Sequence, residues 1–183
     1  MNKKQEVISL SEKYIADVPG FPKPGIIFKD ITPVFEHPDY CQMVFDVMVD
    51  ELKENKIEFD KIACPEARGF LFGVPLGLAT QKGVVIARKP GKLPRPGECV
   101  SYNLEYGAAT LVISKDSIKP GDRVLVADDL LATGGSAKAL CELIEKSGAT
   151  VAGVMFYIEL TPLKGREVLD KYKVLSIVPV EAY

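Results

Sequence analysis

Residues 123–136 read R-V-L-V-A-D-D-L-L-A-T-G-G-S, and this stretch says more about the fold than any other part of the chain. Residues 124–127 form an apolar run with β-branched members, which is typical of a buried strand. Two adjacent carboxylates, Asp128 and Asp129, end that run, and a loop with two glycines follows. From residue 137 to 146 the apolar residues recur at helical spacing. The stretch therefore predicts a strand, a Gly-rich turn and a helix in direct succession.

The turn at residues 132–136 suits a phosphate group. Gly134 and Gly135 let the backbone approach a ligand closely. The N–H groups at the start of the following helix, with the helix dipole behind them, favour an anion. Asp128 and Asp129 would repel that phosphate, so we expect them to accept hydrogen bonds from sugar hydroxyls. A phosphate beside a diol describes a ribose 5-phosphate, although an ordinary strand-to-helix turn with acidic caps remains open on this pattern alone.

Two better-known phosphate motifs are excluded at this turn. No Gly-Lys-Ser or Gly-Lys-Thr follows the glycines, and the dinucleotide fingerprint G-x-G-x-x-G is absent.

The other loops that follow predicted strands are rich in charge. Residues 64–73 read C-P-E-A-R-G-F-L-F-G, where Arg68 could hold an anion by a forked contact or form a surface salt bridge. Arg88, Lys89 and Lys92 form either a pyrophosphate clamp or a solvated face.

The chain from Asp60 onward alternates short apolar runs with helical patterns, which predicts an α/β domain with a mostly parallel central sheet flanked by helices. Strands are expected near 61–64, 84–88, 123–127, 151–158 and 174–178, and crossover helices at 70–81 and 136–147. Helical spacing also covers 3–18 and 38–54, and an antiparallel hairpin is expected over 100–106 and 109–114. At 183 residues, the chain is expected to be one domain, 1–183.

Composition excludes several other functions. The formal net charge of -2 gives no bulk attraction to nucleic acid or membrane. The four cysteines are scattered without C-x-x-C spacing, and the single histidine, His37, precedes a proline in a turn. This leaves no zinc cluster and no support for a Ser-His-Asp or Cys-His device. The polar N-terminus shows no signal peptide, so a cytoplasmic enzyme is expected.

Five segments in order resemble the adenine phosphoribosyltransferases, a family within the type I phosphoribosyltransferases. They read F-P-K-P-G-I-I-F-K-D (21–30), E-A-R-G-F-L-F-G (66–73), R-K-P-G-K-L-P (88–94), Y-N-L-E-Y-G (102–107) and V-A-D-D-L-L-A-T-G-G-S (126–136). A later stretch, E-L-T-P-L-K-G-R-E (159–167), also looks like the family. The resemblance implies the type I fold, with an N-terminal hood over 1–35 that contributes to the base pocket and a flexible catalytic hairpin over 89–114. It also implies that AMP and diphosphate are made from adenine and phosphoribosyl pyrophosphate, in purine salvage, by a cytoplasmic homodimer that uses Mg²⁺.

The resemblance assigns roles residue by residue. Adenine is expected to meet the main chain of Ile27 and Lys29, and the side chains of Phe28 and Leu130 on its two faces. The ribose and its 5-phosphate are expected to meet Asp128, Asp129, Ala132, Thr133, Gly134, Gly135 and Ser136. The pyrophosphate is expected to meet Glu66, Ala67, Arg68, Arg88, Lys89, Lys92 and Tyr106. Glu105 matches the family's proposed acid–base residue, and Mg²⁺ is expected to be held mainly by the substrate, with no protein ligand assigned.

Two departures and two alternatives accompany this interpretation. Cys64-Pro65 stands where the family often has glycine and a small or apolar residue, just before a non-proline cis peptide expected at Glu66–Ala67. Lys29 stands where the family commonly has arginine. A non-catalytic regulator that senses phosphoribosyl pyrophosphate is one alternative, and a phosphoribosyltransferase for a 6-oxopurine is the other.

Overall fold

The computed structural model describes residues 2–104 and 107–181, with only the backbone given at 98–104 and 107–109. Its centre is a five-stranded parallel sheet in the order β4-β3-β7-β8-β9. The strands are β3 (Lys61–Pro65), β4 (Gly83–Ala87), β7 (Arg123–Leu131), β8 (Thr150–Leu160) and β9 (Val174–Val180). Helices α4 (Gly69–Thr80) and α5 (Gly135–Lys146) are the crossovers that the sequence predicts. The predicted α/β class with a mostly parallel sheet is confirmed.

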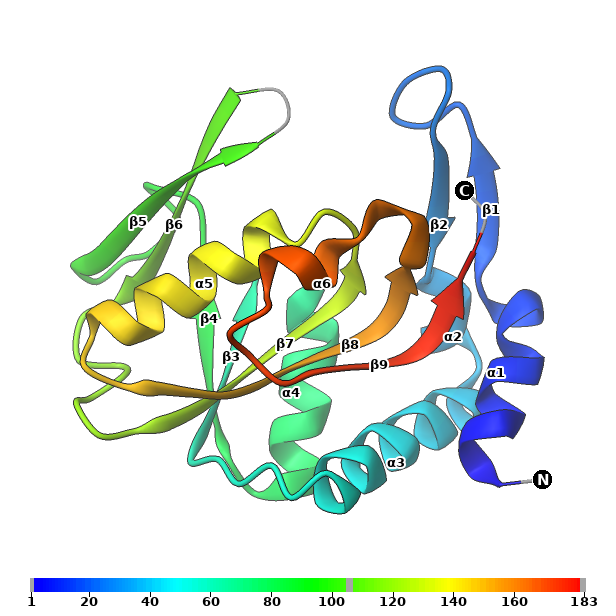
Figure 1. Cartoon of the computed structure of the whole chain (residues 1–183), viewed down its shortest axis with the longest axis horizontal. Helices are drawn as coiled ribbons and strands as arrows, with labels where there is room; N and C mark the ends of the chain where they lie inside the picture. Colours follow the sequence, from blue (N-terminus) through cyan, green and yellow to red (C-terminus); the bar gives the residue numbers. More distant parts are fainter. Residues whose placement is uncertain (1, 105–106, 182–183) are drawn as a thin grey trace.

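Both faces of the sheet are covered, as parallel sheets require. On β7, Val124 and Val126 belong to the apolar cluster that includes α5. Leu125 and Ala127 alternate with them and belong to the opposite cluster, built with α4 and with α3 (Pro38–Glu54). Figure 1 shows α5 over one face of the sheet and α3 and α4 against the other. This arrangement leaves the carboxyl ends of the strands as the natural place for a ligand.

The N-terminal region differs in part from the sequence prediction. The helix expected over 3–18 ends early, as α1 (Lys3–Tyr14), and β1 (Ala16–Pro19) then pairs antiparallel with β2 (Ile27–Asp30). Pairing with β2 overrides the helical spacing, and the Nζ of Lys29 lies 2.6 Å from Oδ1 of Asp17 across the pair. The short helix α2 (Thr32–Glu36) was not predicted, because five residues carry too little periodicity.

A second antiparallel hairpin joins β5 (Gly97–Leu104) to β6 (Gly107–Ser114), near the positions that the sequence predicts. In Figure 1 the β1–β2 and β5–β6 hairpins project on the same side of the molecule. The turn η1 (Thr161–Leu163) and the one-turn helix α6 (Gly165–Val168) follow β8. In the described parts of the chain, no helix has the length and apolar character needed to cross a bilayer.

Strand β7 is longer than the sequence suggests. It was expected to end near Ala127, but it continues to Leu131 because β8 keeps pairing with it, opposite Phe156, Ile158 and Glu159. Asp128 and Asp129 therefore lie inside a strand rather than in a loop. The hydrogen-bonded backbone holds both carboxylates in defined positions.

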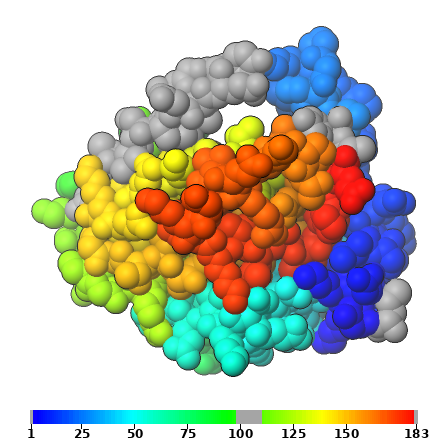
Figure 2. All heavy atoms as spheres, viewed as in Figure 1, coloured from blue at the N-terminus to red at the C-terminus, as the bar shows by residue number. Residues whose placement is uncertain are grey.

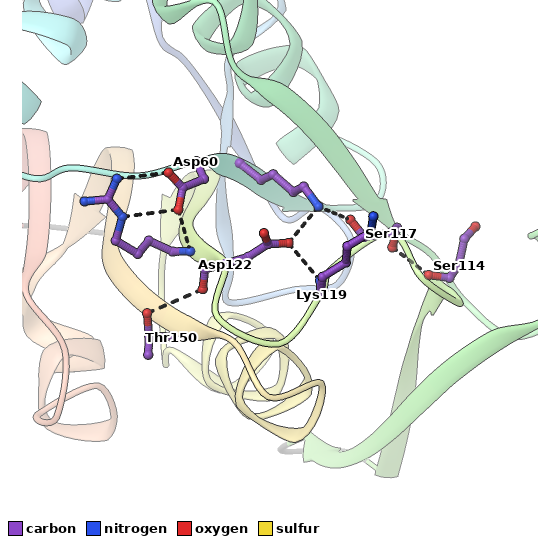
Figure 3. Close-up of polar contacts among 8 residues, drawn as sticks. Asp60, Ser114, Ser117, Lys119, Asp122 and Thr150 are labelled. Carbon is purple, nitrogen blue, oxygen red and sulfur yellow. Dashed lines mark hydrogen bonds and ion pairs between the residues drawn. The ribbon is translucent and has the colours of Figure 1, made fainter.

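The amino-terminal edge of the sheet is held by a polar network (Figure 3). The guanidinium of Arg123 donates to Asp60 at 2.9 Å and to Glu58 at 2.8 Å. Its hydrogen bonds lower the pKa of Asp60 to about 2. Asp122 accepts from Lys61 at 2.7 Å and from the N–H of Lys119 at 2.7 Å. The network ties the strand starts together at the edge opposite the Gly-rich turn.

Candidate active site

A cavity of about 280 Å³ lies at the carboxyl ends of β3 and β7. Residues from two separate predicted segments form its wall, together with a part of β8. The lining residues are Glu66, Ala67, Arg68, Asp128, Asp129, Leu130, Leu131, Ala132, Thr133, Gly134, Gly135, Ser136, Ala137 and Phe156. The tertiary structure thus joins the proposed sugar-phosphate residues to the loop of Arg68. The wall does not include six of the residues proposed for adenine and pyrophosphate: Ile27, Phe28, Lys29, Arg88, Lys89 and Lys92.

The Gly-rich turn leads directly into the first turn of α5. Gly134 is the N-cap residue at φ +82°, a backbone conformation that L side chains rarely adopt. An α-helix leaves its first N–H groups without partners inside the helix, and Gly134 at the N-cap has no side chain with which to cap them. The first turn of α5 contains no acidic residue. These N–H groups, with the helix dipole behind them, would suit an anion at one end of the cavity.

Asp129 lies on the cavity wall with only 4% of its surface exposed. Its Oδ2 is 2.9 Å from Nε of Arg68, which is close enough for charge attraction. Among the described residues, no donor reaches that oxygen with hydrogen-bond geometry. A buried carboxylate oxygen without a hydrogen-bond donor is costly, and a sugar hydroxyl would satisfy it.

Asp128 is held differently from its neighbour. Its Oδ1 accepts a hydrogen bond of 2.9 Å from the N–H of Asp129. Burial raises the pKa of Asp128 well above its ordinary value, and the charge of Asp129 raises it further. The environment therefore disfavours the charged form of Asp128.

Arg68 connects this cavity to the N-terminal hairpin. Its guanidinium carbon lies 4.7 Å from the centre of the Phe28 ring, and its Nη1 donates to the carbonyl oxygen of Lys29 at 3.3 Å. Arg68 therefore contacts Asp129 and two of the four proposed base-binding residues, Phe28 and Lys29. The resemblance assigned Arg68 to the pyrophosphate.

The outer edge of β2 presents main-chain groups that β1 does not bind, and one of them, the carbonyl of Lys29, accepts from Arg68. The N–H of Gly20 donates to the carbonyl of Ile26 at 2.7 Å, and bonded pairs alternate along an antiparallel ladder. Ile27 faces Pro19, which has no N–H, and Lys29 lies two residues further on. The main-chain groups of Ile27 and Lys29 therefore point away from β1, which is the only partner of β2 within the described sheets.

The second group of cations is tied to the loop of Arg68 through Glu66. Nε of Arg88 lies 2.9 Å from Oε2 of Glu66, and Nη1 of Arg88 donates to the carbonyl of Lys92 at 3.0 Å. Although burial alone would raise it, the pKa of Glu66 is lowered by Arg88 and by the N–H of Lys89. The peptide between Glu66 and Ala67 is cis, as the sequence resemblance implied.

The remaining predicted site residues, and three cavity-lining residues that the sequence did not predict, complete the description of the site. Glu105 and Tyr106 lie outside the described residues. Leu130 lines the cavity and packs on the main core. Phe156, Leu131 and Ala137 also line it but were not predicted, because they read as ordinary apolar members of a strand or helix. Only the register of β8 against β7, with Phe156 opposite Asp128, brings Phe156 to the site.

Fold and cavity together define a phosphoribosyltransferase, and the family model for the phosphoribosyl transferase domain matches residues 34–181. The adenine phosphoribosyltransferase of Rubrobacter xylanophilus is 48% identical over 97% of this chain and 96% of its own length. The crystal structure of adenine phosphoribosyltransferase from Thermoanaerobacter pseudethanolicus has a TM-score of 0.90 and 43% identity, covering 97% of this chain and 99% of that one. This chain belongs to the adenine phosphoribosyltransferase family, a group of pentosyltransferases.

A third relative shows a bound base. The adenine phosphoribosyltransferase of Saccharomyces cerevisiae, solved with adenine and an imino-altritol bisphosphate, has a TM-score of 0.88 and 38% identity, over 96% of this chain and 98% of that one. The recognition made from the five sequence segments is confirmed. A non-catalytic regulator and a 6-oxopurine enzyme are not favoured.

Proposed function

We propose that this protein transfers the 5-phosphoribosyl group of phosphoribosyl pyrophosphate to N9 of adenine and so supplies AMP for purine salvage. The observation that supports it most is the pairing, in one cavity, of the start of α5 after Gly134 with the buried Oδ2 of Asp129. The helix start suits the 5-phosphate, and the carboxylate suits the ribose hydroxyls.

The transfer breaks the bond between C1 of the ribose and a pyrophosphate oxygen, which keeps the electron pair. N9 of adenine forms the new bond to C1 and loses its proton. Glu105 is the residue proposed to manage that proton. Arg68, Arg88, Lys89 and Lys92, with the main chain at Ala67, would stabilise the charge that develops on the pyrophosphate. Tyr106 is proposed to join them.

The free edge of β2 gives a physical reason for selecting adenine. On an extended strand, the carbonyl of Ile27 and the N–H of Lys29 can face one base edge, where adenine offers an amino donor and the N1 acceptor. A 6-oxopurine offers the opposite pattern and would leave these groups unpaired. Phe28 would cover one face of the base once the guanidinium of Arg68 leaves its ring, and Leu130 would cover the other.

Magnesium fits this site as a cation carried by the substrate. Within the described residues, no three His, Cys, Asp or Glu side chains gather closely enough to hold a metal ion. Mg²⁺ typically binds through substrate phosphates, waters and one or two carboxylates, and Asp128 and Asp129 are the carboxylates beside the proposed ribose. When bound, the ion would neutralise charge on the departing pyrophosphate.

We also propose a cytoplasmic location, which suits the buried thiols of Cys64 and Cys141.

The proposed activity can be tested directly by competition among bases. Purified protein with Mg²⁺ and phosphoribosyl pyrophosphate is expected to convert adenine to AMP in the presence of equal guanine and hypoxanthine, with little of their nucleotides formed. Chromatography of the products measures the ratio. Formation of IMP or GMP in preference to AMP would assign the enzyme to a 6-oxopurine. DNA binding without turnover of any base would favour the regulator.

We further propose that the protein is a homodimer that uses the outer face of α4. Residues 69–80 contain no charged residue, and an all-round apolar helix is normally buried. Yet Leu71, Val74 and Leu78 are 43%, 47% and 77% exposed, and Ile86 on the edge strand β4 is 39% exposed. Such a patch is typical of an interface, and a second copy would cover it with the same apolar surface.

Replacing Leu78 with glutamate is expected to turn the dimer into a monomer, because burying an unpaired carboxylate at a two-fold contact is costly on both sides. Size-exclusion chromatography with light scattering measures the mass. Val18→Glu is the matched control, since Val18 is an exposed apolar residue outside α4. A Leu78→Glu protein with the mass of the parent dimer would rule out this face.

A further inference from the structure

Residues 161–168, which form η1 and α6, have no role in the site described above. All but the last of them belong to the stretch E-L-T-P-L-K-G-R-E (159–167) that resembles the family. No residue of this segment lines the cavity. In Figure 2 the orange residues of this part of the chain pack against the yellow residues of α5. The segment therefore lies against the element that carries the proposed phosphate site.

The contact between the segment and the Gly-rich turn is one of backbone on backbone. Gly165 is buried, and a Cβ on it would collide with the carbonyl oxygen of Ala132 and lie 2.7 Å from a methyl of Leu131. A Cβ on Gly134 would lie 2.7 Å from the carbonyl oxygen of Gly165 and 3.4 Å from Cβ of Val168. Two glycines are thus needed for the turn and the segment to approach this closely.

An ion pair between the exposed Arg166 and the buried Glu159 holds the segment in place beside this contact. Arg166 donates to both carboxylate oxygens of Glu159 at 2.7 Å, in a forked arrangement. The same guanidinium donates to the carbonyl of Val174 at 2.7 Å and to Oγ of Ser176 at 2.9 Å, both on β9. Glu159 is 7% exposed and lies opposite Leu131 in the β7–β8 ladder, one residue before the turn begins. Arg166 therefore joins β8, β9 and the segment in a fixed geometry.

We propose that Gly165 and Arg166 are positioning residues for the 5-phosphate: the segment 161–168 is a rigid support that sets where the turn 132–136 presents its N–H groups. The inference rests on the proposed function for the identity of the ligand, a sugar phosphate. Donors aimed at a phosphate must be held within a fraction of an ångström, and a support of packed backbone does this without touching the ligand. The segment thereby acts on phosphoribosyl binding and not on the base.

Gly165→Ala is expected to raise the dissociation constant of ribose 5-phosphate, and the KM for phosphoribosyl pyrophosphate, by about tenfold, since a shift of about 1 Å can cost about 100-fold. The KM for adenine is expected to change little. Titration calorimetry with ribose 5-phosphate and steady-state kinetics give the two readouts. Gly83→Ala is the matched control, because a Cβ there meets nothing within 4 Å and Gly83 has no positive φ. The control is expected to bind as the parent does.

Arg166→Lys gives a second and milder test, which serves if Gly165→Ala fails to fold. It keeps the charge and loses the fork, so a smaller rise in the same dissociation constant is expected. Its control is Arg123→Lys, which breaks a comparable forked pair with Asp60 at the opposite edge of the sheet. If Gly165→Ala, or Arg166→Lys in its place, lowers the melting temperature but binds ribose 5-phosphate as the parent does, the support is structural only and the proposal is wrong.

The same titration separates this inference from the proposed function. A parent that binds ribose 5-phosphate but makes no AMP would remove the activity, and the variants would still test the support. If the parent does not bind ribose 5-phosphate, both the proposed function and the proposed role of segment 161–168 are wrong.

Discussion

Replacing Asp129 with asparagine is expected to weaken the binding of AMP and of phosphoribosyl pyrophosphate by about 10- to 100-fold. Asp129 is almost fully buried, and its Oδ2 has charge attraction from Arg68 but no hydrogen-bond donor in the described structure. A hydrogen bond to a charged group contributes about 1.5–3 kcal/mol, and about 1.4 kcal/mol corresponds to a factor of ten in affinity. The asparagine variant keeps the shape of the side chain and removes the charge.

Calorimetric titration with AMP measures this loss. Asp122→Asn is a suitable control, because Asp122 is also paired with a cation, Lys61, but lies at the amino-terminal edge of the sheet. The control is expected to lose some stability and to bind AMP as the parent does. Parent-like affinity in Asp129→Asn would remove this residue from the ribose site and would undo the main support for the proposed function.

Replacing Glu105 with alanine is expected to lower the turnover number by about 10²- to 10⁴-fold, the usual contribution of a general acid–base residue. The affinity for phosphoribosyl pyrophosphate is expected to stay close to that of the parent, because the proposed role of Glu105 concerns the proton of the base. Rapid-quench measurement of AMP formation separates the chemical step from product release.

Glu105→Asp provides the comparison for this experiment. It keeps a carboxylate on a shorter side chain, so it is expected to recover part of the lost rate. The turnover of this variant is expected to depend on pH in the same way as that of the parent. Turnover in Glu105→Ala that equals the parent's would exclude the residue from the reaction. An equal fall in affinity and turnover would assign it to binding.

Much of the fold could be predicted because its signals are local. The apolar runs of β3, β4, β7, β8 and β9 and the spacing of α3, α4 and α5 all lie within one element each. The Gly-rich turn is also local, since it is made by consecutive residues at a helix start. Apart from the end of β7, these features were predicted with nearly correct boundaries.

The errors arose where distant segments compete with local preference. The spacing of Ile15 continues the first helix, but pairing with β2 makes 16–19 a strand. The acidic pair looks like the end of a strand, but eleven residues of β8 extend β7 past it. Both outcomes depend on hydrogen bonds to a partner strand that periodicity does not reveal.

The sequence by itself determined the family, the parallel sheet and the position of the Gly-rich turn before a helix, because each depends on neighbouring residues. Only the tertiary structure decided that Arg68 would contact Phe28, Lys29 and Asp129 together, and that Gly165 would lie against the turn of Gly134. These contacts join residues far apart in the chain. Their geometry follows from strand register and from close backbone packing, which no single stretch of sequence contains.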